Sequence, residues 1–159
     1  MSKYHIIEAD LDDEGHQQTV LNMVRSFAQA VTGEDLPEER HGKLVDGLSR
    51  HPTAIVFIAL STDVAVGFSV CFLGFSTFMA RPVINIHDFY VEKQHRRQGV
   101  GRQMLDAIEK RARLLDCCRL TLEVEANNQE ALPLYHRFGF EQVEYSTVAG
   151  SVLFRHKVL

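Results

Sequence analysis

A short stretch of arginines and glycines in the middle of the chain constrains its fold more than any other feature. The sequence Arg96-Arg97-Gln98-Gly99-Val100-Gly101 follows a strand-like run over residues 83–91 and precedes a segment with one apolar face. The apolar residues of that segment recur at the spacing of an amphipathic helix: Val100, Met104, Leu105, Ile108, Ala112 and Leu115. The pattern therefore predicts a strand that enters a helix through a glycine-containing turn.

Such a turn is suited to hold an anion. The first backbone N–H groups of a helix have no partner within the helix, and the helix dipole makes this end positive. Gly99 and Gly101 let an anion approach the backbone, and Arg96, Arg97 and Arg102 supply positive charge. The spacing is that of neither a P-loop nor a Gly-x-Gly-x-x-Gly turn. Taken alone, it predicts either a phosphate site or a basic turn that caps an ordinary surface helix.

Two motifs together are more specific than this turn alone. The first is Arg/Gln-x-x-Gly-x-Gly/Ala after a strand, matched by Arg96, Gly99 and Gly101. The second is Asn-x-x-Ala-x-x-x-Tyr-x-x-x-Gly-Phe, matched by Asn128, Ala131, Tyr135, Gly139 and Phe140. On these residues the chain resembles the GNAT superfamily of N-acetyltransferases, which use acetyl-coenzyme A (acetyl-CoA). The resemblance covers about residues 50–145, and the first fifty residues only by the order of elements.

The order of the expected elements is also that of the GNAT family: a strand, two helices, three strands, a helix, a strand, a helix and two strands. These patterns lie at residues 4–9, 13–31, 37–48, 53–60, 64–75, 83–91, 99–115, 119–125, 128–138, 141–146 and 151–157. Gly67 and Gly74 are expected to mark bulges or close approaches. We therefore predict one α/β (α+β) domain over residues 1–159, with a central mixed, mostly antiparallel sheet of about seven strands and helices on both faces.

Composition excludes several classes of function. The formal net charge of −4 gives no electrostatic reason to expect a nucleic-acid partner. No apolar run approaches the roughly 20 residues that cross a bilayer, so we expect no membrane association. Cys71, Cys117 and Cys118 have neither metal-ligand spacing nor a disulfide pattern. They predict free thiols in a cytoplasmic protein without a metal site.

The resemblance assigns the cofactor-binding residues. In the family, the strand before the glycine turn separates from the next strand, and its exposed backbone binds the pantetheine arm. This implies main-chain contacts from Phe89 and Val91, and a backbone amide near Phe89 or Tyr90 that polarises the thioester carbonyl. The pyrophosphate is then held by the backbone of Arg96, Arg97, Gln98, Gly99, Val100, Gly101 and Arg102. Asn128 either lies close to the cofactor or caps the helix that it begins, and both roles are compatible.

The resemblance also suggests the groups that move protons. Tyr135 corresponds to the tyrosine that protonates the leaving sulfur, although it also fits a core tyrosine of an amphipathic helix. Residues 86–91 resemble a strand of the diamine and polyamine acetyltransferase branch, in which a glutamate is tied to amine deprotonation and His87 takes its place. His87 either accepts a proton, directly or through water, or is a hydrogen-bonded structural histidine. Because adjacent strand residues face opposite ways, only one of His87 and Asp88 is expected to face the cleft.

The expected activity is acetyl transfer from acetyl-CoA to a primary amine of a small molecule, by direct attack in a ternary complex. A diamine, a polyamine or an amino-acid derivative fits, although Asn127 stands where the polyamine branch has tryptophan. Peptide or protein amines are the alternative acceptors, and a non-catalytic acyl-CoA-binding regulatory module is the alternative function. Acidic residues between Asp10 and Glu39 either attract a cationic amine or are solvated helix-end charges. Pairing through a sheet edge or the C-terminal strands is common in the family, so a homodimer is among the expected states.

Overall fold

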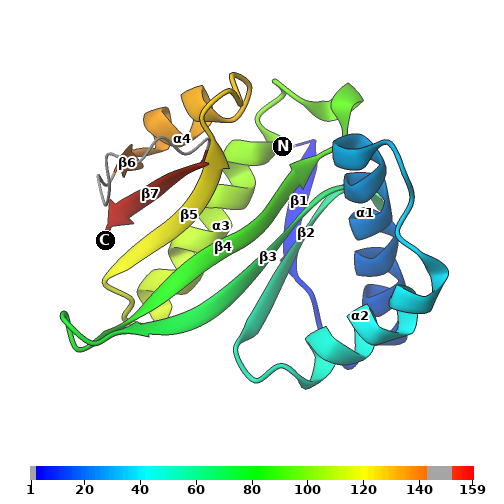
Figure 1. Cartoon of the computed structure of the whole chain (residues 1–159), viewed down its shortest axis with the longest axis horizontal. Helices are drawn as coiled ribbons and strands as arrows, with labels where there is room; N and C mark the ends of the chain where they lie inside the picture. The colour runs from blue at the N-terminus through cyan, green and yellow to red at the C-terminus, as the bar shows by residue number, and fades with distance from the viewer. Residues whose placement is uncertain (1–2, 143–151) are drawn as a thin grey trace.

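A seven-stranded sheet forms the centre of the molecule (Figure 1). The computed structural model describes residues 3–142 and 152–159. The strands lie in the order β1-β2-β3-β4-β5-β7-β6, and among the described strands only the β4–β5 pair is parallel. They are β1 (Tyr4–Glu8), β2 (Ala54–Ser61), β3 (Val64–Ser76), β4 (Arg81–Val91), β5 (Arg119–Glu125), β6 (Glu141–Gln142) and β7 (Val152–Val158). The predicted mixed, mostly antiparallel sheet is confirmed.

Helices cover both faces of this sheet (Figure 1). They are α1 (Glu14–Thr32), α2 (Glu38–Arg50), α3 (Val100–Leu114) and α4 (Leu132–Phe138), with a short 3-10 helix at Lys93–His95. The apolar side chains of α1 and α2 pack on one face, where they meet alternate residues of β2, β3 and β4. Those of α3 and α4 pack on the other face, against the intervening residues and β5. Because successive side chains of a strand point to opposite faces, the same sheet contributes apolar residues to both layers.

The ends of the helices follow local capping chemistry. Asp13 accepts a hydrogen bond from the backbone N–H of His16 at 2.8 Å, and Gly33 ends α1 in the left-handed conformation, with φ 79°. The fourth helix is shorter than the predicted range 128–138, because residues 128–131 form a turn in which Asn128 Oδ1 accepts from the N–H of Ala131 at 3.0 Å. The predicted turn at residues 149–150 lies outside the described residues.

Two irregularities interrupt the register around β3. One lies between β2 and β3 and leaves Val66 without a direct partner on β2. There a Cβ on Gly67 would lie 2.9 Å from the carbonyl oxygen of Tyr90, which confirms the predicted close approach. Gly74 marks neither feature, because its register is regular and a Cβ would make an ordinary contact with Val83 at 3.4 Å. The second irregularity is a β-bulge in β4, and it lies in the candidate site.

The parallel strands β4 and β5 separate halfway along their length. Their pairing runs from Val83 opposite Arg119 to Ile86 opposite Leu122 and goes no further. Beyond this point β5 remains paired with β7, and β4 remains paired with β3. Residues 87–91 of β4 therefore have backbone groups on one side that β5 does not engage.

The three cysteines are buried and unpaired, in agreement with the prediction of free thiols. Burial raises the pKa of Cys71 to about 12, so this thiol stays protonated at neutral pH. None of the described helices combines the length and the apolar character needed to cross a membrane.

Candidate active site

A cavity of about 520 Å³ lies beside the end of β4, between the start of α3, the start of α4 and the last turns of α1. Most of the predicted cofactor-binding residues line it: Phe89, Tyr90, Val91, Arg96, Arg97, Gly99, Gly101, Arg102, Asn128 and Tyr135. The fold thus brings the two sequence motifs to one cavity, although the glycine turn and Tyr135 lie far apart in the chain.

The glycine turn leaves the start of α3 open to a ligand. Gly99 occupies the N-cap position with φ 87°, and it provides no side-chain cap for the first turn. Arg97 also adopts a positive φ of 58°, which turns the chain sharply before the helix. The first N–H groups of α3 are therefore available to an anion, and the dipole of the helix favours one there.

Gly101 brings α4 close to α3. A Cβ at this position would lie 2.8 Å from Cδ2 of Leu134 and 3.6 Å from Cε1 of Phe89. A side chain here would therefore push Leu134 aside, and Leu134 is part of the cavity wall. The second glycine of the motif is thus explained by packing around the cavity.

Arg96 connects three parts of the cavity wall. Its Nε donates to the carbonyl oxygen of Val91 at 2.9 Å, and one terminal nitrogen donates to a carboxylate oxygen of Glu130 at 2.7 Å. Its guanidinium carbon also lies 5.8 Å from the centre of the Tyr90 ring. Sequence reasoning missed Glu130, because the two loops that meet here are 34 residues apart.

The side chains of Gln98 and Val100 do not line the cavity. Gln98 accepts hydrogen bonds through Oε1 from the Tyr4 hydroxyl at 2.8 Å and from Lys3 at 3.0 Å. Val100 is buried in a small apolar cluster with Tyr4 and Met104. For these two residues, the predicted cofactor role therefore depends on their backbone groups alone.

Tyr135 is buried, and it still reaches the cavity wall. Its ring makes edge contacts with Phe89 and Phe140, with ring centres 5.9 Å and 5.8 Å apart. Burial raises the pKa of Tyr135, so its hydroxyl holds its proton throughout the physiological pH range. The residue is therefore compatible with both alternatives that its sequence left open, a core position and a proton donor.

The β-bulge in β4 places His87 and Asp88 on the same face of the sheet. Val70 pairs with Asp88 and Cys71 with Ile86, so His87 has no direct partner on β3. The His87 ring lies 5.5 Å from that of Phe72, and both Phe72 and Val70 belong to the layer under α1 and α2. The expectation that these neighbours face opposite ways is therefore wrong, because the inserted residue breaks the alternation.

The two side chains differ in environment. His87 is exposed, whereas Asp88 is half-buried. Burial raises the pKa of Asp88, and the nearby charge of His87 partly opposes this shift. Neither residue lines the larger cavity.

A second cavity, of about 370 Å³, opens where β4 and β5 separate. Asn85, Ile86 and His87 line it from β4, and Glu123, Val124 and Glu125 line it from β5. Sequence reasoning missed both glutamates. The family resemblance implied that the strands separate, but it did not indicate which side chains of residues 119–125 would line the opening.

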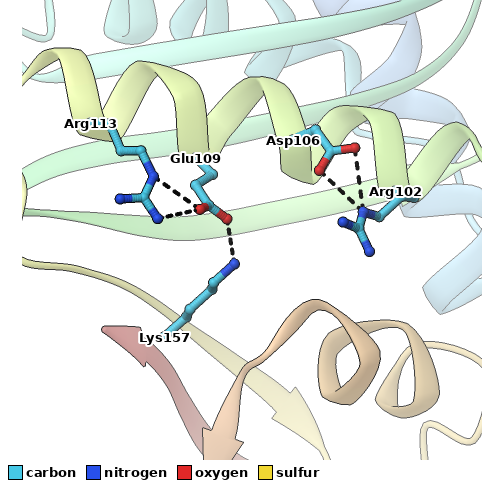
Figure 2. A network of polar contacts seen from close by, with 5 residues as sticks. All are labelled: Arg102, Asp106, Glu109, Arg113 and Lys157. Atoms are coloured by element: carbon cyan, nitrogen blue, oxygen red, sulfur yellow. Dashed lines mark hydrogen bonds and ion pairs between the residues drawn. The ribbon is translucent and has the colours of Figure 1, made fainter. Parts of the chain in front are cut away.

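Ion pairs order the outer side of α3 (Figure 2). Arg102 donates to Asp106 one turn away at 3.1 Å, and its guanidinium carbon lies 4.8 Å from the centre of the Phe138 ring. Further along, Glu109 accepts from Arg113 at 2.7 Å and also from Lys157, which ties α3 to β7. Desolvation raises the pKa of Glu109, but the hydrogen bonds from these cations outweigh it and hold that pKa below its usual value.

Comparisons with known proteins identify relatives over parts of the chain. Residues 20–140 match the Acetyltransferase (GNAT) family. A probable spermine N(1)-acetyltransferase of Bacillus subtilis subsp. natto is 41% identical over 54 residues, which are 33% of this chain and 36% of that protein. A thialysine N-epsilon-acetyltransferase of Bos taurus is 28% identical over 78 residues, 49% of this chain and 45% of that protein. The matched stretches thus span less than half of each relative.

Solved structures share the whole fold at low sequence identity. The PaiA N-acetyltransferase of Thermoplasma acidophilum, in complex with coenzyme A, superposes with a TM-score of 0.70 and 14% identity, covering 100% of both chains. An aminoglycoside acetyltransferase from an uncultured soil metagenomic sample, in complex with sisomicin, gives 0.76 and 18% identity over 93% of this chain and 97% of that one. These likenesses establish the architecture of the sheet and its helices.

Proposed function

The chain belongs to the GNAT acetyltransferase family, and from this premise we propose that it transfers an acetyl group from acetyl-CoA to a primary amine of a small molecule. The observation that carries the proposal is the convergence on one cavity of the open start of α3, the unpaired end of β4 and Tyr135. A basic turn that only capped a surface helix would not require the other two.

The cavity fits the two chemical parts of such a cofactor. The free N–H groups at the start of α3, with Arg96, Arg97 and Arg102 around them, suit a diphosphate. The side of the Phe89–Val91 backbone that β5 does not engage suits the amide groups of a pantetheine arm, which would add to β4 as a further strand does. Acetyl-CoA supplies the acetyl group as an activated thioester.

The proposed roles of the side chains follow from their protonation. The attacking amine must be neutral, and direct attack requires both substrates in one ternary complex. His87 lines the cavity between the separated strands, and a neutral imidazole there suits proton acceptance, directly or through water. Asp88 lies beside it on the same face and stabilises the charged imidazole. Tyr135 keeps its proton and suits its delivery to the departing sulfur.

The acceptor is proposed to be a small amine of the kind that the spermine and thialysine relatives are named for, a polyamine or an amino-acid derivative. Peptide or protein amines are the alternative within the same chemistry. A cytoplasmic location and a homodimer remain predictions.

A release assay tests the proposal. The protein is incubated with acetyl-CoA and one acceptor from a panel of primary amines and peptides, and the release of free coenzyme A is measured. Release is expected with small amines. Tyr135→Phe should lower kcat by about 100-fold, within the usual range for a general acid, with little change in cofactor affinity. Binding of coenzyme A without turnover of any acceptor would instead support a non-catalytic acyl-CoA-binding module. Absence of coenzyme A binding to folded protein would refute both.

A further inference from the structure

We propose that Glu123 and Glu125 select acceptors with a second cationic group, so that the enzyme prefers linear diamines and polyamines to monoamines. This inference rests on the proposed acetyl transfer and assigns the acceptor specificity of the same site. The observations that carry it are the cavity between the separated strands and the carboxylates that line its β5 side.

The alternation of β5 sets the direction of both glutamates. Leu120, Leu122 and Val124 are buried in the layer beneath α3. Glu123 and Glu125 are exposed and lie on the opposite face, about 6.7 Å apart along the strand. That face is shared with β4, because Asn85 donates a hydrogen bond to Thr121 at 3.1 Å just before the strands separate.

Both carboxylates carry uncompensated charge. Within residues 3–142 and 152–159, neither Glu123 nor Glu125 makes an ion pair or a side-chain hydrogen bond. By contrast, Glu130 in the wall of the larger cavity pairs with Arg96, and Glu109 on α3 pairs with Lys157. A cavity wall with two free carboxylates attracts a cation more strongly than carboxylates that are already paired, such as those of Glu130 and Glu109.

The same cavity connects this charge to the reacting groups. His87 lines its β4 side, opposite the glutamates, and two residues further along β4 Phe89 lines the larger cavity. An acceptor with two amines can therefore place one beside His87, where it loses its proton. Its other amine remains an ammonium and pairs with Glu123 or Glu125. A monoamine cannot do both, because the nitrogen that attacks must be neutral.

The acidic residues nearer the N-terminus are stabilised by their own local surroundings. Glu38 and Glu39 lie in the first turn of α2, where the helix dipole favours negative charge. Asp35 is paired with Arg25, at 2.5 Å between the charged atoms. None of these three side chains lines either cavity.

The experiment compares diaminobutane with n-butylamine, which share a carbon chain and differ in the second amine. Values of kcat/KM are measured for the wild type, for Glu123→Gln/Glu125→Gln, and for Glu38→Gln/Glu39→Gln as a control with the same change in charge. The ratio of the diamine value to the monoamine value should fall about two- to tenfold in the first variant, as expected for the loss of one or two exposed ion pairs. In the control it should be unchanged. Added salt should lower the wild-type ratio as well.

Equal ratios in the wild type and Glu123→Gln/Glu125→Gln would overturn the inference, as would an equal fall in the control. If the wild type acetylates no amine, the proposed function fails, and calorimetry on the coenzyme A complex decides this inference separately. Tighter binding of diaminobutane than of n-butylamine, lost in Glu123→Gln/Glu125→Gln, would support it. Equal binding of the two amines would overturn it.

Discussion

The ion pair between Arg96 and Glu130 predicts that a carboxylate competes with the cofactor for the glycine turn. Glu130 reaches Arg96 at 2.7 Å, and both residues line the cavity in which a diphosphate is proposed to bind. A diphosphate that pairs with Arg96 would displace Glu130. The substitution Glu130→Gln should therefore strengthen the binding of coenzyme A, although it removes a contact from the free protein.

The size of the effect follows from exposure. The side chain of Arg96 is 35% exposed and that of Glu130 is 61% exposed, so the pair belongs with surface ion pairs. Such pairs contribute about 0.2–1 kcal/mol. At about 1.4 kcal/mol for each factor of ten, release of this competition lowers the Kd of coenzyme A by a factor of about 1.4 to 5. The same loss lowers the Tm of the free protein by at most about 4 °C for a chain of this size.

Isothermal titration calorimetry and thermal unfolding measure the two effects together. Glu130→Gln should show a lower Tm without ligand and a larger rise in Tm on addition of coenzyme A. Pantetheine, which lacks the diphosphate, should bind both proteins equally. Asp116→Asn is the matched control, because it removes an ion pair of the same length, 2.7 Å, from Arg81, whose side chain is 40% exposed, and neither residue lines the cavity.

Weaker binding of coenzyme A to Glu130→Gln would refute the competition. It would mean that Glu130 orients Arg96 in the complex as well as in the free protein. An equal gain in affinity for pantetheine would also refute it, because the effect would then not involve the phosphates.

Three further predictions concern the walls of the site and the outer side of α3. Gly101→Ala should weaken coenzyme A binding at least about fivefold in calorimetry, because the new methyl group displaces Leu134 in the cavity wall. It should not lower Tm, because alanine stabilises a helix by up to about 1 kcal/mol relative to glycine. Unchanged affinity would show that the cavity wall adjusts freely. Glu109→Gln should lower the free energy of unfolding in urea by about 1–3 kcal/mol at neutral pH. Because folding lowers the pKa of Glu109, the wild type and the variant should differ fully in free energy of unfolding above pH 4.5, the ordinary pKa of this carboxyl, and less as the pH falls below it. A difference that stays constant across this range would contradict the ion pairs with Arg113 and Lys157. His87→Ala should remove the acidic limb of the kcat/KM profile against pH, and an unaltered limb would exclude His87 as the essential base.

Features that depend on a short segment could be predicted from the sequence. The glycine turn, the apolar face of α3 and the cap at Asp13 each arise from residues a few positions apart, so their pattern determines the local structure. The order of strands and helices could also be predicted, because each element has its own local pattern in the sequence. Many residues in the wall of the larger cavity could be predicted in the same way, because they belong to two motifs that are each contiguous in sequence.

Features that depend on contacts between distant segments could not be predicted. Glu130 meets Arg96 only because the loop before α4 returns to the end of β4. The last turns of α1 border the larger cavity through Phe27 and Val31, which the predicted range of this helix, residues 13–31, did not indicate. In both cases the residue type was informative, whereas the partner was determined by tertiary packing.

The β-bulge at His87 combines both kinds of information. The strand pattern of β4 is regular in sequence, and a regular strand would turn His87 and Asp88 to opposite faces. Their common face results from one residue more on β4 than on the facing stretch of β3, which only the pairing of Val70 with Asp88 and of Cys71 with Ile86 reveals. The bulge lies immediately after Ile86, the last residue of β4 that pairs with β5. Because the inserted residue bends its strand and increases its twist, the same local change can account for the separation of β4 from β5 and for the shared orientation of the two ionisable side chains. The orientation of His87, the proposed proton acceptor, and of its neighbour Asp88 would then have the same structural cause as the opening between the strands.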